Sequence, residues 1–127
     1  MIINKIFSLK KKKVIIVGGS RGIGKKLVTS FLKSGASVVN LSRSKLSISK
    51  KNFLSIKCDI SNFNDIEVAY KIIKKKLKNI DVLINCSGIT LSKKTKNFDF
   101  NAFKKIVDLN LVFIFKLNTI LVPLLKK

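Results

Sequence analysis

Residues 14–24 constrain the fold more than any other stretch of the chain. An apolar, β-branched run over 14–17 leads into a glycine-rich segment, and apolar residues at helical spacing follow it. The glycine-rich segment reads Gly18-Gly19-Ser20-Arg21-Gly22-Ile23-Gly24. Such glycines allow positive φ and the close approach of a bulky anion, and the N-terminus of the next helix offers N–H groups to a phosphate. The stretch predicts strand, turn and helix, although a tight structural turn alone would explain the glycines about as well.

Apolar runs and helical patterns alternate along the rest of the chain. Strands are predicted over 14–17, 37–41, 54–58 and 81–85, and helices over 22–33, from 61–65 to 77, and from about 99 or 101 to 121. Gly35 is expected to end the first helix in the left-handed conformation, and 90–97 is expected to be a polar loop. This alternation predicts an α/β fold with a parallel sheet and right-handed crossovers. The length suits one domain over 1–127, with a basic lead-in over 1–13.

The formal net charge of +21 raises the question of a nucleic-acid partner. Only two of the 27 basic residues, Arg21 and Arg43, are arginine. Specific recognition of phosphates and bases favours the bidentate guanidinium, and the lysines are spread along the whole chain. We therefore expect a background composition bias and salt-sensitive attraction to polyanions, but no specific nucleic-acid partner.

The cysteines and the most apolar stretch bear on the compartment. Cys58 and Cys86 are 28 positions apart, which is neither a metal-ligand nor a redox spacing, so free, buried or half-buried thiols in the cytoplasm are expected. Residues 1–9 make a poor signal peptide. The stretch 109–125 contains two asparagines, a lysine and a proline, which a bilayer would disfavour. We expect a buried or interface helix there and no membrane partner.

Polar and small residues follow the predicted strands. In a parallel sheet the ligand lies outside the carboxyl ends of the strands, so these residues are expected to meet. Beyond the glycine-rich turn of the first strand, they are Ser42, Arg43 and Ser44 after the second, Asp59 after the third, and Asn85, Ser87 and Gly88 at the fourth. Each is common at a strand end by itself, and the agreement of four strand ends makes the case for one site.

Arg43 bears on the choice of cofactor. It lies 19 positions beyond Gly24, near where an NAD-binding domain would place an acidic residue against the ribose 2′-hydroxyl. A cation cannot accept a hydrogen bond from that hydroxyl but can pair with a 2′-phosphate, and Arg21 is a second possible partner. The pattern favours NADP(H) over NAD(H), with a solvated arginine as the alternative. Asp59 is a short carboxylate that could accept from the adenine amino group.

Together these motifs resemble the short-chain dehydrogenase/reductase family over essentially the whole chain. The glycine-rich segment is similar to the family's Gly-x-x-x-Gly-x-Gly fingerprint, with Val17 where a threonine is usual. Cys58-Asp59-Ile60 resembles its adenine-side aspartate, and 81–89 resembles its Asn-Asn-Ala-Gly strand with Cys86 and Ser87 substituted. The segment 107–111 is similar to the helix that carries the family's catalytic asparagine, here Asn110.

The resemblance implies a Rossmann-type sheet of strand order 3-2-1-4 with helices on both faces, incomplete relative to the family. It also implies hydride transfer between NAD(P)(H) and a small carbonyl or alcohol substrate. In the family a Ser, a Tyr and a Lys follow the position of Asn110, and this sequence stops before them. We expect the truncated, cofactor-binding half of an oxidoreductase, and the alternative is an inert dinucleotide-binding module or gene remnant. Tyr70 and Lys74 have the Tyr-x-x-x-Lys spacing, but they precede the fourth strand and are not expected to be catalytic.

The resemblance bears on association as well. The family pairs the fourth strand with a fifth, so an exposed strand edge is expected here. The last helix belongs in the family to a subunit interface. A homo-oligomer, or association through the fourth strand and the last helix, is therefore expected.

Overall fold

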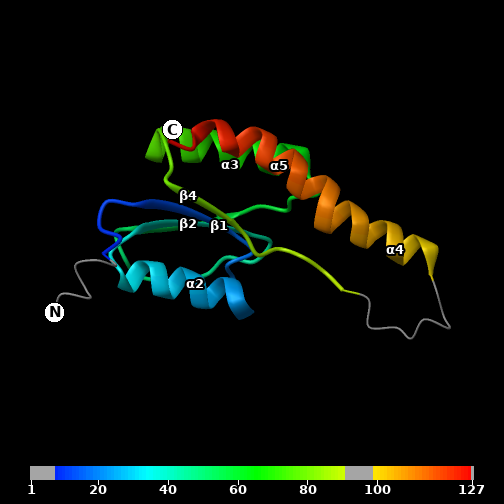
Figure 1. The fold of residues 1–127 in the computed structure, drawn as a ribbon, viewed down its shortest axis with the longest axis horizontal. Coiled ribbons are helices and arrows are strands. Elements are labelled where there is room, and N and C mark those ends of the chain that lie inside the picture. The colour runs from blue at the N-terminus through cyan, green and yellow to red at the C-terminus, as the bar shows by residue number, and fades with distance from the viewer. Residues whose placement is uncertain (1–7, 91–98, 127) are drawn as a thin grey trace.

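The computed structural model describes residues 8–90 and 99–126. The predicted loop from 91 on and most of the lead-in lie outside these ranges. A four-stranded sheet of order β3-β2-β1-β4 lies at the centre, and all its strand pairs are parallel (Figure 1). Its strands are β1 (Lys13–Val17), β2 (Ser37–Ser42), β3 (Phe53–Lys57) and β4 (Val82–Asn85). The predicted parallel α/β fold and strand order are confirmed, with strand bounds shifted by at most one residue.

Helices cover both faces of the sheet. α2 (Gly22–Lys33) lies on one face, and α3 (Phe63–Leu77) and α5 (Phe113–Leu121) lie on the other (Figure 1). Successive side chains of a strand point to opposite faces, so Val14 and Ile16 pack with α2 while Ile15 and Val17 pack with α3 and α5. Burial on both faces explains the continuous apolar run of the first strand.

Local signals place the helix ends. Gly35, at φ +90°, ends the turn after α2, and the side chain of Asn62 accepts from the N–H of Asn64 at the start of α3. The side chain of Asp99 accepts from the N–H groups of residues 101 and 102 and so starts α4 (Phe100–Val107). Among the apolar residues of α3, Ile66 and Ile73 are buried, whereas Ile72 is 38% exposed.

The last predicted helix is divided into unequal parts. Between α4 and α5 lies a π-helical turn over Asp108–Val112, and a 3₁₀ turn over Val122–Leu124, which contains Pro123, follows α5. The pattern of apolar residues had predicted one continuous helix. A π turn inserts an extra residue, so the side chains on its two sides are out of phase with a 3.6-residue repeat.

Asp81 joins three segments at the amino edge of the sheet. Its Oδ2 accepts from the N–H of Lys13 at 2.8 Å, and its Oδ1 lies 3.1 Å from Nζ of Lys126. Ile80 pairs with Leu125 in an isolated parallel bridge. The end of the described chain is thereby held beside the starts of β1 and β4.

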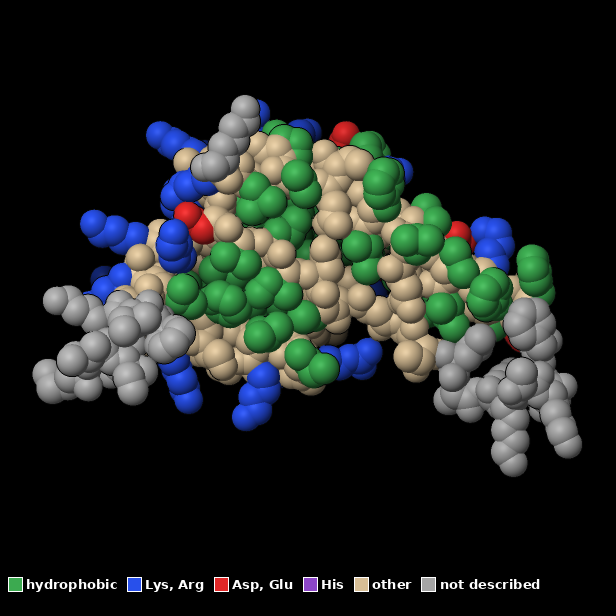
Figure 2. Space-filling model, in the orientation of Figure 1, with side chains coloured by type: hydrophobic (Ala, Val, Ile, Leu, Met, Phe, Trp, Pro, Cys, Tyr) green, Lys and Arg blue, Asp and Glu red, His purple; other side chains and the backbone are tan. Residues whose placement is uncertain are grey.

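The helical segment Phe100–Leu124 leaves much apolar surface exposed. It projects from the body of the molecule, and apolar side chains lie along it (Figures 1 and 2). Phe100, Leu111 and Phe115 are each about two-thirds exposed. By length and composition the segment could cross a membrane: its most apolar 18-residue window has mean hydropathy 1.7, and 11% of that window is buried. The buried or interface helix expected from the sequence is therefore packed on the sheet only through its second half, where Leu117 and Leu121 are buried.

Candidate functional site

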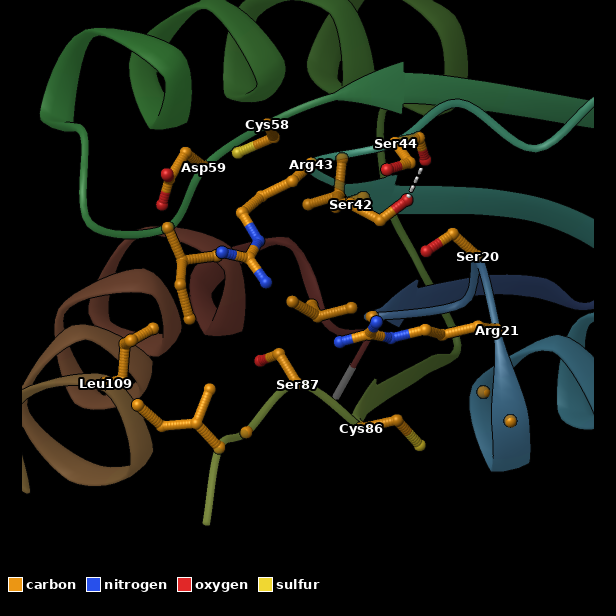
Figure 3. Close-up of a pocket in the computed structure, with 18 of the residues that line it drawn as sticks. Ser20, Arg21, Ser42, Arg43, Ser44, Cys58, Asp59, Cys86, Ser87 and Leu109 are labelled. Atoms are coloured by element: carbon orange, nitrogen blue, oxygen red, sulfur yellow. Dashed lines mark hydrogen bonds between the residues drawn. The ribbon is translucent and has the colours of Figure 1, made fainter. Parts of the chain in front are cut away.

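A cavity of about 660 Å³ opens at the carboxyl edge of the sheet. It lies where the glycine-rich turn, the end of β2, the segment after β3 and the extension of β4 come together (Figure 3). Eleven of the predicted cofactor-site residues line it: Gly18, Ser20, Arg21, Gly22, Ile23, Gly24, Arg43, Asp59, Ile60, Ser87 and Gly88. All four strand ends thus contribute to one cavity.

The glycine-rich turn is held close to the extension of β4. Gly18 has φ +85°, and a Cβ placed on it would lie 2.7 Å from the backbone nitrogen of Ser87. Gly22 also has positive φ, +54°, but a Cβ there would meet only open space. Gly18 allows the end of β1 to pack closely against the extension of β4, and Gly22 leaves open space on the cavity side.

The N-terminus of α2 forms one wall of the cavity. Arg21 is its N-cap, and among the described residues no side chain caps it and no acidic residue stands in its first turn. The N–H groups of a first helical turn have no partner within the helix, and the dipole makes this end positive. An anionic group of a ligand suits this wall.

Two guanidinium groups project into the cavity from different strand ends. Arg21 comes from the turn after β1 and Arg43 from the end of β2, and both side chains extend toward the middle of the cavity (Figure 3). Both residues are exposed. The two guanidinium groups can bind one phosphate from two sides, because a guanidinium forms paired, charge-assisted hydrogen bonds to phosphate oxygens.

Asp59 lies on the opposite wall, close to Arg43. Its Oδ1 accepts from the N–H of Ser61 at 2.9 Å and from the hydroxyl of Ser61 at 2.7 Å. These two bonds, and to a smaller extent the charge of Arg43, lower the pKa of the Asp59 carboxyl. The group is therefore an acceptor at neutral pH, and among the described residues no hydrogen bond to its Oδ2 is found.

Ser87 supplies an unsatisfied polar atom. Its Oγ is buried and has no hydrogen-bond partner among the described residues, and its side chain points into the cavity (Figure 3). A buried hydroxyl without a partner is costly, and a polar ligand group would remove that cost. The orphan hydroxyl, the uncapped helix and the open space at Gly22 together fit a dinucleotide.

Asn85 and Asn110 lie beside the cavity, outside the set of described residues that line it. Asn85 donates through Nδ2 to Oδ1 of Asn118 at 3.1 Å. Asn110 lies in the π-helical turn, and its amide accepts from the N–H of Ile89 at 2.9 Å and donates to its carbonyl at 2.8 Å. In this structure the Asn110 side chain fastens the extension of β4 to the helix.

Some lining residues were not foreseen as site residues. Leu41, Ile89 and Leu109 contribute apolar surface, and Cys86 is a half-buried free thiol there. Leu109 belongs to the π-helical turn, so helical periodicity gave no signal for it. Tyr70 lies away from the cavity, half-buried against the core, and Nζ of Lys74 lies 5.6 Å from the centroid of its ring.

The sheet order and the glycine-rich turn at the carboxyl edge define a Rossmann-type fold. Comparison with known proteins then gives the family. The sequence model of the short chain dehydrogenase family matches residues 12–127. The chain belongs to the short-chain dehydrogenase/reductase family and corresponds to its N-terminal half.

Relatives of this family match the chain in sequence, and solved structures of the family match it in fold as well. The chain is 31% identical over 124 residues to a 3-ketodihydrosphingosine reductase of Mus musculus, covering 87% of this chain and 37% of that protein. A short chain dehydrogenase of Leptospira borgpetersenii with bound NAD+ is 30% identical, with TM-score 0.84, and the match covers 96% of this chain and 48% of the other. A 3-ketoacyl-(acyl-carrier-protein) reductase of Brucella melitensis complexed with NADH is 27% identical, with TM-score 0.84, over 92% and 51% of the two chains. The chain thus spans about half or less of the proteins it matches.

Proposed function

We propose that the chain is the cofactor-binding half of an oxidoreductase that transfers hydride between NADP(H) and a carbonyl or alcohol carbon of a small substrate. The observation that carries the proposal is the meeting of four strand ends at one cavity, with an uncapped helix N-terminus on one wall. Family membership supports the same reaction class. The bound cofactor would supply the hydride at its nicotinamide ring.

Each part of the cofactor has suitable residues in the cavity. The N-terminus of α2 beside Gly22 would hold the pyrophosphate. Asp59 would accept from the adenine amino group, and the orphan hydroxyl of Ser87 would bond a polar group of the cofactor. Arg21 and Arg43 would pair with the 2′-phosphate, which favours NADP(H) over NAD(H).

Replacing Arg43 with alanine tests the cofactor preference. Removing a charge-assisted hydrogen bond should weaken NADPH binding by about 1–3 kcal/mol, or roughly fivefold to 150-fold, while NADH binding changes little. Fluorescence titration with both cofactors at one salt concentration measures this. Lys50→Ala is the matched control, because it removes the same charge from an exposed position outside the described lining of the cavity. Equal weakening of both cofactors would contradict the role of Arg43.

A second candidate function is dinucleotide binding without turnover. The cavity and the uncapped N-terminus of α2 would serve dinucleotide binding by themselves, without a reaction on a second substrate. NADPH binding without NADPH oxidation, tested on a panel of carbonyl substrates, would support it. Turnover that Asn110→Ala abolishes would overturn it.

We further propose that copies of the chain associate in the cytoplasm. Exposed Phe100, Leu111 and Phe115 on the projecting helix support association, as does β4 at the edge of the described sheet. The free thiols of Cys58 and Cys86 suit a reducing compartment. Neither a specific nucleic-acid partner nor a membrane partner is part of the proposal.

A further inference from the structure

Among the described residues, the fully or nearly fully buried polar side chains are those of Asn40 and Ser42, both on β2. Asn40 is 0% exposed, and it shares the α2 face of the sheet with Val38 because the two are one strand period apart. A buried amide in the middle of a parallel strand is costly unless its hydrogen-bonding groups have partners. The partners of Asn40 therefore indicate its role.

The amide of Asn40 connects three segments of the chain. Its Oδ1 accepts from the N–H of Gly19 at 2.8 Å, two residues before Arg21 in the glycine-rich turn. Its Nδ2 donates to Oγ of Ser42 at 2.9 Å and to Oγ of Ser55 on β3 at 3.1 Å. Both amide hydrogens and one carbonyl lone pair are used, so the side chain is held in one orientation.

The two serines extend this connection to the loop after β2. The hydroxyl of Ser42 donates to the carbonyl of Ser44 at 2.7 Å (Figure 3), and Oγ of Ser55 accepts from the N–H of Leu46 at 3.0 Å. Arg43 lies between Ser42 and Ser44, so the first bond closes a turn around the arginine. The hydrogen bond from the Leu46 N–H to Ser55 holds the loop at a point three residues beyond Arg43.

We infer that Asn40 is a positioning residue for cofactor discrimination. Through its amide it fixes the spacing between the glycine-rich turn, which carries Arg21, and the loop that carries Arg43. A 2′-phosphate needs both guanidinium groups at one place, whereas a 2′-hydroxyl does not. Asn40 lies outside the described lining of the cavity, so it acts through the loops that it holds. This inference rests on the proposed preference for NADP(H).

Asn40→Ala tests the inference, with the ratio of the NADH and NADPH dissociation constants as the readout. Loss of the hydrogen bonds that order the Arg43 loop should lower this ratio roughly threefold to tenfold. Ser55→Ala is the second variant in case Asn40→Ala does not fold, and it should lower the ratio in the same direction. Asn52→Ala is the control, because Asn52 donates to the carbonyl of Ala36 at 2.7 Å at the opposite end of β2. It should leave the ratio unchanged.

Combination with Arg43→Ala separates positioning from general destabilisation. In that background Asn40→Ala should lower the ratio less than it does in the unaltered chain, because the Arg43 guanidinium that Asn40 helps to position is no longer present. An unchanged ratio in both Asn40→Ala and Ser55→Ala, while Arg43→Ala lowers it, would overturn the inference and leave the proposed function standing. A ratio that Arg43→Ala does not alter would overturn the proposed preference itself.

Discussion

Replacing Gly18 with alanine should destabilise the fold far more than the same change at Gly22. Both glycines have positive φ, which costs an L-residue about 1–2 kcal/mol. At Gly18 the new Cβ would also lie 2.7–2.9 Å from the backbone of Cys86 and Ser87. The β4 extension would have to retreat, straining the hydrogen bond of 2.8 Å from the Cys86 N–H to the Val17 carbonyl.

The difference between the two variants isolates this close approach. Overpacking against backbone typically costs about 1–3 kcal/mol, and the entropy that alanine removes from the unfolded chain is nearly the same at both positions. Gly18→Ala should therefore lose about 1–3 kcal/mol more unfolding free energy than Gly22→Ala, as measured by urea denaturation followed by circular dichroism. Equal losses would show that the extension of β4 moves away from a Cβ at position 18 without cost. That result would refute the claim that close packing requires glycine there.

Three further predictions concern acid stability, thiol reactivity and association. A hydrogen bond from the N–H of Lys13, and then the hydrogen bond and charge of Lys126, lower the pKa of the Asp81 carboxyl. The stability that ionised Asp81 contributes is therefore complete above the ordinary carboxyl pKa of 3.8 and is lost as pH falls below that value. Asp81→Asn should flatten the dependence of the melting temperature on pH in that acid range. Burial, and then nearby carboxylates, raise the pKa of the Cys58 thiol to about 11, so maleimide at neutral pH should label Cys86 first, and NADPH should slow that labelling. Phe115→Asp should shift size-exclusion chromatography with light scattering toward the monomer, and an unchanged mass would contradict association through the projecting helix.

The strands and most of the cavity could be predicted from sequence because their signals are local, whereas the strand order was implied by the resemblance to the family. β-branched runs such as 14–17 specify strands buried on both faces, and the residue after each run lies at the carboxyl edge whatever the loops do. Once the strand order is 3-2-1-4, the ends of all four strands must be neighbours. Arg43 and Asp59 could therefore be assigned to one cavity although 16 positions separate them.

Side-chain partners across the structure could not be predicted in the same way. The orientation of Asn85 toward Asn118 depends on where α5 packs, and the tie between Asn110 and Ile89 depends on the π-helical turn. Neither the packing position of α5 nor the π-helical turn leaves a periodic trace in the sequence. Asn40 carried a weak signal, since a polar residue in an apolar strand is unusual, but its partners on β3 and in the glycine-rich turn are set by strand register.

The glycine-rich turn explains why a polar residue is needed in the middle of β2. At the end of β1 the chain leaves the sheet, and the N–H of Gly18 still bonds the carbonyl of Leu41 at 2.7 Å. The next N–H, that of Gly19, faces the packed interior under α2, where a Cβ on Gly19 would lie 2.7 Å from a methyl group of Val28. An apolar residue at position 40 would leave that N–H buried without a partner, which costs about 1–3 kcal/mol. The turn that suits a dinucleotide therefore requires an acceptor on β2, and the asparagine that supplies it also fixes the arginine loop.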